Sequence, residues 1–173
     1  MTLETKRLRL RPFTEEDAGD LFAYASDPRV GPMAGWPPHK TMEYSREIIR
    51  TVFRNPNEFA IVLRETGHVI GSVGLVGRDR GESSDELGYV LSPAYWGRGI
   101  VPEAAEAVLR YGFAELGLKE IWCVCREDNR QSRRVIEKCG FTYLFTERCT
   151  PEDDKSPKMR FHVLLRENWE RRR

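Results

Sequence analysis

The sequence lacks three features that mark large classes of protein. No apolar run approaches the ~18 residues that cross a membrane, and Met1 leads into the charged stretch 6–11 rather than an apolar segment. Only 4 residues are cysteine, too few for a disulfide scaffold of this length. Lys and Arg number 28 against 27 Asp and Glu, so the basic excess of a nucleic-acid-binding domain is missing. We therefore expect a cytoplasmic protein that binds neither membrane nor nucleic acid.

The cysteines do not have the spacing of a metal site. Cys123 and Cys125 alternate on one predicted strand, Cys139 and Cys149 stand apart, and no paired CxxC spacing occurs. We interpret all four as reduced, with Cys123 and Cys125 as small buried side chains, and we expect no metal. The concentrated basic segment 171–173 is typical of a solvated chain end.

The apolar content is sufficient for one core. Hydrophobic residues make up 40% and charged residues 32% of a chain whose length suits a single domain over residues 1–173. Apolar periodicity predicts the order β, α, α, β, β, β, α, β, α, β, β. Because a strand, helix, strand unit needs a right-handed crossover, this order predicts an α/β fold with a mixed sheet of about seven strands and about four helices.

The predicted elements can be placed by residue number. Strands are expected at 5–11, 59–64, 68–76, 85–91, 119–125, 141–148 and 160–165. Helices are expected after the caps Thr14 and Thr41, from Pro102 as the first helical residue to Leu116, and over 129–138. Segments 31–40 and 77–84 are expected to be loops. In the first of these loops, Trp36 either lines a site or covers a core edge.

The most informative segment, Trp96 to Val101 (WGRGIV), lies between the predicted strand 85–91 and the following helix. Two glycines allow a tight turn that exposes successive N–H groups, and the helix start adds a positive dipole end, so a phosphate can bind there. The segment is neither a Walker loop nor a GxGxxG motif. Taken alone, such a segment is more often an ordinary turn.

Four segments together carry a family resemblance: TKRLRLRPFTEEDA, ELGYVLSP, YWGRGIVPEA and NRQSRRVIEKCGF. The chain resembles the GCN5-related N-acetyltransferase (GNAT) superfamily, and more narrowly its RimJ/RimL-like branch of ribosomal-protein N-acetyltransferases. The resemblance implies a mixed sheet whose fourth and fifth strands are parallel and splayed. It also implies an N-acetyltransferase, a monomer or homodimer, that uses acetyl-CoA without a metal. The implied acceptor is a primary amine, either a protein N-terminus, ribosomal by analogy, or a small molecule.

The resemblance also assigns the cofactor-binding residues. The family's phosphate loop corresponds to Trp96, Gly97, Arg98, Gly99, Ile100 and Val101. Trp96 replaces the usual Gln or Arg, and Val101 replaces a small residue. The pantetheine arm would pair with backbone groups near Val90 and Leu91, as an added strand does, and would bond Asn129. Arg133, Arg134 and Lys138 either contact the adenosine 3′-phosphate or form a solvated basic face.

Acetyl transfer needs a base, because an alkylammonium group has a pKa near ~10.4 and must lose a proton before it can attack. Glu86 on the strand 85–91 is the candidate. Two other interpretations are that Glu86 is a solvated strand residue or a carboxylate that holds a substrate cation. A backbone N–H near Val90 would stabilise the oxyanion.

The proton donor to the leaving thiolate is less well marked. Many superfamily members have a tyrosine seven residues after the asparagine, where this chain has Ile136. Ser132 matches the serine of the RimL-like branch, either as the acid or as a small residue that lets the cofactor approach. Tyr89 is interpreted as core. Because of Ile136 and Val101, the alternative function is a non-catalytic CoA-binding sensor or interaction module.

Overall fold

The computed structural model describes residues 1–77, 81 and 83–172, so part of the predicted loop 77–84 and Arg173 of the basic segment lie outside the described residues. The described residues form an eight-stranded sheet in the order β1-β2-β3-β4-β5-β6-β8-β7. About seven strands were predicted, and the additional one is β1, whose two residues are too few to give an alternating pattern. The strands are β1 (Leu3–Glu4), β2 (Leu8–Arg11), β3 (Glu58–Leu63), β4 (Val69–Leu75), β5 (Ser84–Leu91), β6 (Glu120–Arg126), β7 (Thr142–Arg148) and β8 (Lys158–Leu165).

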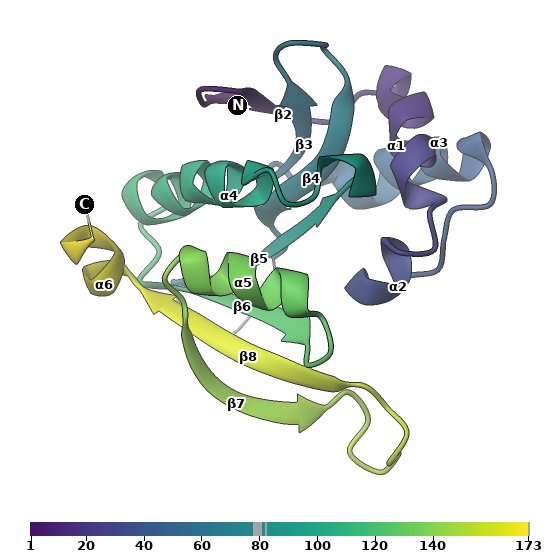
Figure 1. The fold of residues 1–173 in the computed structure, drawn as a ribbon. Coiled ribbons are helices and arrows are strands. Elements are labelled where there is room, and N and C mark those ends of the chain that lie inside the picture. The colour runs from purple at the N-terminus through teal and green to yellow at the C-terminus, as the bar shows by residue number, and fades with distance from the viewer. Residues whose placement is uncertain (78–80, 82, 173) are drawn as a thin grey trace.

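Helices cover both faces of this sheet (Figure 1). The buried side chains of α4 and α5 pack on one face, and those of α1 and α3 pack on the other. The described helices are α1 (Ala18–Ala25), α2 (Gly31–Ala34), α3 (Met42–Thr51), α4 (Ile100–Arg110), α5 (Arg130–Lys138) and α6 (Arg166–Arg171). None of them is both long and apolar enough to cross a membrane.

Several local predictions are confirmed. Thr41 caps α3, because its side-chain oxygen accepts a hydrogen bond from the Tyr44 N–H. The strands β3 and β4 form a hairpin, as the short turn 65–67 between the two predicted strands indicates, with Gly67 in a left-handed conformation in the turn. Cys123 and Cys125 are buried, and all four cysteines are free. The local signals that encode caps, turns and alternation therefore predict most elements.

Other predictions are wrong. Helix α2 lies inside the predicted loop 31–40, and α6 was not predicted. Helix α4 begins at Ile100, because Gly99 adopts a left-handed conformation and serves as its N-cap. Pro102 is therefore the third helical residue, where an N–H has no intrahelical acceptor in any case. The helical spacing of Ile48, Ile49 and Val52 predicts one buried stripe, but Val52 follows the end of α3 and is 52% exposed.

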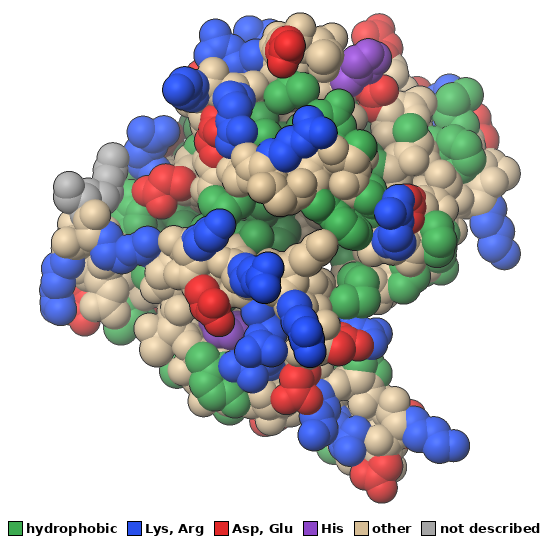
Figure 2. Space-filling view, viewed as in Figure 1, with side chains coloured by type: hydrophobic (Ala, Val, Ile, Leu, Met, Phe, Trp, Pro, Cys, Tyr) green, Lys and Arg blue, Asp and Glu red, His purple; other side chains and the backbone are tan. Residues whose placement is uncertain are grey.

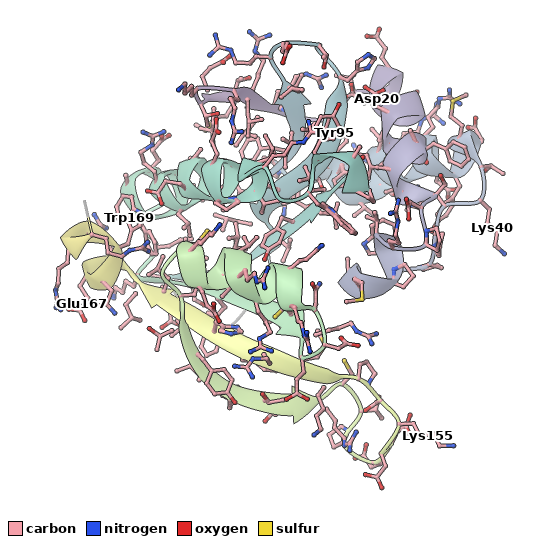
Figure 3. All side chains as sticks on the ribbon, viewed as in Figure 1. Asp20, Lys40, Tyr95, Lys155, Glu167 and Trp169 are labelled. Carbon is pink, nitrogen blue, oxygen red and sulfur yellow. The ribbon has the colours of Figure 1, made fainter. Side chains whose placement is uncertain are left out.

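The C-terminal basic segment is more than a solvated end. Helix α6 packs through Trp169, whose indole Nε1 donates to Glu106 of α4 at 3.2 Å (Figure 3). The Arg172 guanidinium donates to the carbonyl oxygens of Lys138 and Cys139 at the end of α5. A cation at a helix C-terminus interacts favourably with the dipole and with the last carbonyl groups.

The feature that matters most for function is a fork in the sheet. Strand β5 pairs with β4 along residues 87–91, but it pairs in parallel with β6 only from Ser84 to Glu86. Beyond Glu86 and its partner Trp122 the two strands separate, and β6 instead pairs with β8 along its whole length. The predicted parallel, splayed pair is confirmed, and Figure 1 shows it between α4 and α5.

Candidate active site

The fork opens into a cleft of about 1120 Å³. Because the cleft passes between β5 and β6, both faces of the sheet contribute side chains to it, including Tyr24, Phe53 and Glu58 on the α1–α3 face and Asn129 and Ser132 from α5. Figure 2 shows the hollow between the α4 half and the α5 half of the molecule, with hydrophobic side chains inside it. A cleft of this size holds an extended ligand and leaves room for a second one.

The phosphate-loop candidate, Trp96 to Val101, leads directly into α4. Gly97 and Gly99 have φ of +75° and +70°, a conformation that residues with a Cβ rarely adopt. No side chain caps the helix, and no residue in the described part of the chain accepts a hydrogen bond from the N–H groups of residues 97–101. These adjacent donors at a helix start can therefore bind an anion.

Trp96 fixes this loop to the end of β5. Its indole Nε1 donates to the Leu91 carbonyl oxygen at 2.9 Å, and the Arg29 guanidinium carbon lies 5.8 Å from the centroid of its ring. The Arg98 guanidinium lies over the Tyr95 ring at 5.4 Å. The loop and the open edge of β5 are thus parts of one structure.

The antiparallel ladder with β4 decides which backbone groups of β5 face the fork. The Val76 N–H donates to the Glu86 carbonyl oxygen, and the Ser92 N–H donates to the Ile70 carbonyl oxygen. Because the direction alternates along an antiparallel strand, residues 86, 88 and 90 direct their polar groups toward β4. An added Cβ at Gly71 of β4 would lie only 2.3 Å from the carbonyl oxygen of Val90, which agrees with that direction.

The alternate residues of β5 direct their N–H and C=O groups toward the fork. These residues are Leu87, Tyr89 and Leu91. Of the two positions predicted to pair with the pantetheine arm, Leu91 therefore presents an N–H to the cleft, while Val90 does not. The Leu91 carbonyl oxygen already accepts the Trp96 indole. The same geometry moves the predicted oxyanion donor from Val90 to the N–H groups of Leu91 or Tyr89.

Glu86 lies at the apex of the fork. It is the last residue of β5 that pairs with β6, it lines the cleft, and it is only 5% exposed. The interpretation of Glu86 as a solvated strand residue is therefore wrong. The pKa of the neighbouring Cys123 thiol is raised, first by burial and then by nearby negative charge that includes Glu86. A carboxylate thus lies where the cleft crosses the sheet.

Asn129 and Ser132 lie together at the start of α5, and both line the cleft. The Asn129 Oδ1 accepts the Ser132 N–H at 3.0 Å as the helix cap, which leaves the side-chain NH2 of Asn129 as a donor. The Ser132 Oγ lies 2.7 Å from the hydroxyl oxygen of Tyr89. Ile136, where the family tyrosine is usual, is buried and 1% exposed.

Tyr89 was predicted to belong to the core, and the structure gives it a polar role as well. Its ring packs against the core cluster on the α4–α5 face, but its hydroxyl reaches Ser132 and the cleft. Burial raises the pKa of Tyr89 well above 10.0, so this hydroxyl stays protonated at neutral pH. Alternation predicts its face, but no local signal predicts a partner on a helix 43 residues away.

Two further residues that line the cleft, Glu58 and Tyr24, are not among the site residues predicted from the sequence. Glu58 begins β3, one residue before the predicted strand start, and its alternation with Ala60 and Val62 places it on the α1–α3 face. Burial raises the pKa of Glu58 above 4.5. The signal that the sequence did offer is a charged residue at the start of a strand whose other residues on the same face are apolar.

The loop residues Trp36 and His39 also line the cleft. Trp36 also packs against the core cluster on the α1–α3 face. It therefore both lines a site and covers a core edge, the two roles considered for it from the sequence. The His39 Nδ1 lies 2.7 Å from the Ser45 Oγ, and burial lowers the pKa of His39 below 6.5. The His39 side chain that lines the cleft is therefore uncharged at neutral pH.

Basic side chains gather at the α5 side of the cleft, as Figure 2 shows. Arg134 and Lys138 line the cleft, while Arg133 lies beside them on the same helix. Among the described residues, no group of three or more His, Cys, Asp or Glu side chains is arranged to hold a metal ion.

Glu103 of α4 supports the loop from behind. Its carboxylate accepts hydrogen bonds from the Thr5 hydroxyl at 2.6 Å, the Arg7 N–H at 2.8 Å and the Arg7 guanidinium at 2.7 Å. Arg7 in turn donates to the Arg98 carbonyl oxygen at 2.9 Å. Burial raises the pKa of Glu103, but these hydrogen bonds outweigh burial and hold the pKa below 4.5.

Comparison with known proteins agrees with this arrangement. The family model described as "Acetyltransferase (GNAT) domain" matches residues 7–142. The chain is 31% identical to the uncharacterized N-acetyltransferase YnaD of Bacillus subtilis (strain 168), over 98% of this chain and 99% of that protein. It is 24% identical to spermidine N(1)-acetyltransferase of Escherichia coli (strain K12), over 78% of this chain and 73% of that protein.

Solved structures give the same fold. An acetyltransferase (GNAT family) from Bacillus anthracis matches with a TM-score of 0.87 and 28% identity, covering 96% of this chain and 99% of that one. A putative ribosomal-protein-serine acetyltransferase from Vibrio cholerae matches with a TM-score of 0.80 and 20% identity, covering 95% and 97%.

We predict that Glu103→Gln lowers the free energy of unfolding by about 1–3 kcal/mol at pH 7, because a partly buried charged acceptor of several hydrogen bonds is lost. The folded-state pKa lies below 4.5, so this stabilisation is complete above pH 4.5 and disappears as the pH falls through the folded-state pKa. Urea unfolding of both proteins at pH 7 and at acidic pH measures this difference in the free energy of unfolding. The exposed Glu115→Gln on the same helical run is the control, with an expected change below about 0.5 kcal/mol. Equal losses in the two variants contradict the prediction.

Proposed function

The chain belongs to the acetyltransferase (GNAT) family, and from that membership we propose that it transfers the acetyl group of acetyl-CoA directly to a primary amine. The observation that carries this proposal is the fork in the sheet. One side of the fork holds N–H donors that have no acceptor among the described residues and are suited to phosphate, and its apex holds the buried carboxylate of Glu86. The cleft between them connects the two faces of the sheet.

Acetyl-CoA fits the α4–α5 side of the cleft. In the proposal, the N–H groups of Gly97 to Val101 bind the pyrophosphate. The open edge of β5 at Tyr89 and Leu91 pairs with the pantetheine arm, and the Asn129 side-chain NH2 donates to the same arm. The basic side chains of α5, Arg134 and Lys138 foremost, face the 3′-phosphate.

The proposed reaction forms one bond and breaks one bond. The neutral amine nitrogen attacks the thioester carbonyl carbon, the C–N bond forms, the C–S bond breaks, and CoA leaves as a thiolate. The nitrogen loses one proton in becoming an amide, and the thiolate gains one. Glu86 removes protons from the nitrogen through water, or it holds the substrate cation, which is the alternative that kinetics must separate. The N–H of Leu91 or Tyr89 donates to the oxyanion.

The proposed proton donor to the thiolate is Ser132 together with Tyr89. At 2.7 Å their hydroxyl groups are close enough to pass a proton from Tyr89 through Ser132 to the sulfur. Because burial keeps Tyr89 protonated at neutral pH, it supplies the acid that Ile136 does not. This pair weakens the case for the alternative of a non-catalytic CoA-binding module.

A screen of acceptors tests the proposed function. The purified protein is mixed with acetyl-CoA and with primary amines of two kinds, peptides with free N-termini and small alkylamines, and free CoA is followed. Cys149 is exposed and also reacts with thiol reagents, so CoA is separated before it is quantified. Turnover with any of these amines supports the proposal. CoA binding without thioester consumption by any of them supports the sensor instead.

For the cofactor site, we expect Gly99→Glu to abolish CoA binding, because it places a carboxylate where the phosphates bind. The control Gly99→Ala shares the backbone strain of a residue with a Cβ at φ +70° but adds no charge, so its CoA affinity should fall far less. Calorimetric titration with CoA compares the two. If Gly99→Glu folds and binds CoA as the wild type does, the loop is not the phosphate site.

For the base, Glu86→Gln keeps the shape of the side chain and removes its basicity. Turnover should fall ~10² to 10⁴-fold with acetyl-CoA affinity nearly unchanged. Steady-state kinetics with a working acceptor measures both. A raised acceptor KM with wild-type kcat would instead assign Glu86 to cation binding.

For the acid, Tyr89→Phe and Ser132→Ala should each lower kcat by about tenfold, because solvent can still protonate the thiolate. Since the two hydroxyl groups act in series, the double variant should lose no more than the larger single loss. A double-mutant cycle on kcat provides the measurement. Losses that multiply, or wild-type turnover in Ser132→Ala, exclude the relay.

A further inference from the structure

The α1–α3 side of the cleft contains a carboxylate that has no cationic partner among the described residues. Glu58 lines the cleft, and it forms no ion pair with any residue in the described ranges. Within the described part of the chain, its carboxylate has one polar contact, a long hydrogen bond of 3.4 Å from the Asn55 side chain, which donates more closely to the Leu75 carbonyl oxygen at 2.8 Å. Glu58 is only partly exposed, and carboxylates withdrawn from water are normally paired, so this one has the character of a ligand site.

A second polar group on the same face of the sheet also lacks a hydrogen-bond partner among the described residues. Tyr24 of α1 is 3% exposed and lines the same cleft, and its hydroxyl forms no hydrogen bond with the described residues. It lies close to Ser72 of β4, on the same face of the sheet as Glu58. A buried hydroxyl without a partner costs free energy, which a ligand that hydrogen-bonds to it would recover.

Sheet register places Glu58 at a useful distance from the reaction centre. Glu58 is opposite Gly74, and Gly74 is opposite Gly88, which lies two residues along β5 from Glu86. With strands ~4.8 Å apart and ~3.4 Å per residue, the Cα atoms of Glu58 and Glu86 lie about 12 Å apart on one face. The two glycines between them carry no side chains of their own, and the Val76 side chain covers Gly88, where an added Cβ would lie 2.7 Å from the Val76 Cγ1. The separation suits a short extended chain that passes over Val76 between the two carboxylates.

The walls around that floor are apolar and uncharged. Trp36, Tyr44 and Phe53 line this part of the cleft, and His39 is neutral at neutral pH. Aromatic faces attract alkylammonium groups, and they accommodate the methylene chain of the same molecule. In the described residues, the lysine and arginine side chains that line the cleft come instead from β6, α5 and β7.

We propose that the acceptor is a small aliphatic diamine, and that Glu58 with the Tyr24 hydroxyl holds the ammonium group that is not acetylated while the other nitrogen lies at Glu86. This inference rests on the proposed acetyl transfer and specifies its substrate class. A protein N-terminus offers one cation followed by a peptide backbone, so it leaves Glu58 without a partner. A monoamine does the same.

The test compares two amines of equal carbon number, diaminobutane and butylamine, with acetyl-CoA and free CoA as the readout. The wild type should use diaminobutane with a kcat/KM roughly tenfold to a hundredfold higher, the range expected for one charged hydrogen-bonded contact. Glu58→Gln should raise KM for diaminobutane by a similar factor. It should leave kcat, and both constants for butylamine, within about threefold.

Two further variants complete the test. Glu147→Gln removes a carboxylate from the opposite wall of the cleft, on β7, and should change neither amine's KM beyond about twofold, which controls for long-range charge. Tyr24→Phe removes only the hydroxyl and should raise the diamine KM alone. It also provides a separate test if Glu58→Gln does not fold.

The outcomes separate the inference from the proposed function. Equal use of the two amines, equal effects of Glu58→Gln on both, or turnover of peptides but not of diaminobutane would overturn the diamine subsite and leave acetyl transfer standing. A folded protein that binds CoA but consumes no thioester with any amine would overturn the proposed function, and the subsite with it.

Discussion

The separation of β5 from β6 after Glu86 is the constraint on which the rest of the site depends. A backbone N–H or C=O removed from water needs a partner, and a strand inside a sheet normally finds its partners on both neighbours. Strand β6 meets this need by pairing with β8, while on the free edge of β5 the N–H and C=O of Tyr89 and the N–H of Leu91 face the cleft. The sheet therefore contains an unfilled strand position. A ligand with amide groups at strand-like spacing is the natural occupant, and the pantetheine arm of acetyl-CoA has two.

The fork also divides the charges of the cleft into two regions. The loop donors and the basic side chains of α5 lie on the α4–α5 side, which suits a polyanionic ligand. Glu58, Glu86 and aromatic walls lie on the other side, which suits a cation. Two ligands of opposite charge can therefore enter from opposite faces of one sheet and meet at the apex. This arrangement favours a ternary complex in which neither substrate has to leave before the other binds.

Much of the fold, and part of the site, could be predicted from the sequence. Alternation and caps are local, so the hairpin β3–β4, the Thr41 cap and the glycine loop before α4 follow from neighbouring residues. The polar role of Tyr89 could not be predicted, because its partner belongs to a helix that only the tertiary fold brings within 2.7 Å. Glu58 was missed for a different reason: it lies at a strand boundary, where fraying makes any assignment uncertain by a residue or two.

The cysteines bear on whether the reaction forms a covalent acetyl-enzyme intermediate. Cys123 and Cys125 both line the cleft, so a thiol is close enough to raise the question of an acetylated intermediate. The thiolate, not the thiol, is the nucleophile, and burial is the main cause that raises the pKa of both side chains. Negative charge nearby raises that of Cys123 further, including the charge of Glu86. The same carboxylate that would make the amine a better nucleophile makes the adjacent cysteine a worse one. This opposition supports direct attack by the amine on acetyl-CoA, because burial keeps both thiols in their unreactive form and, at Cys123, the charge of the residue proposed to activate the acceptor adds to that effect.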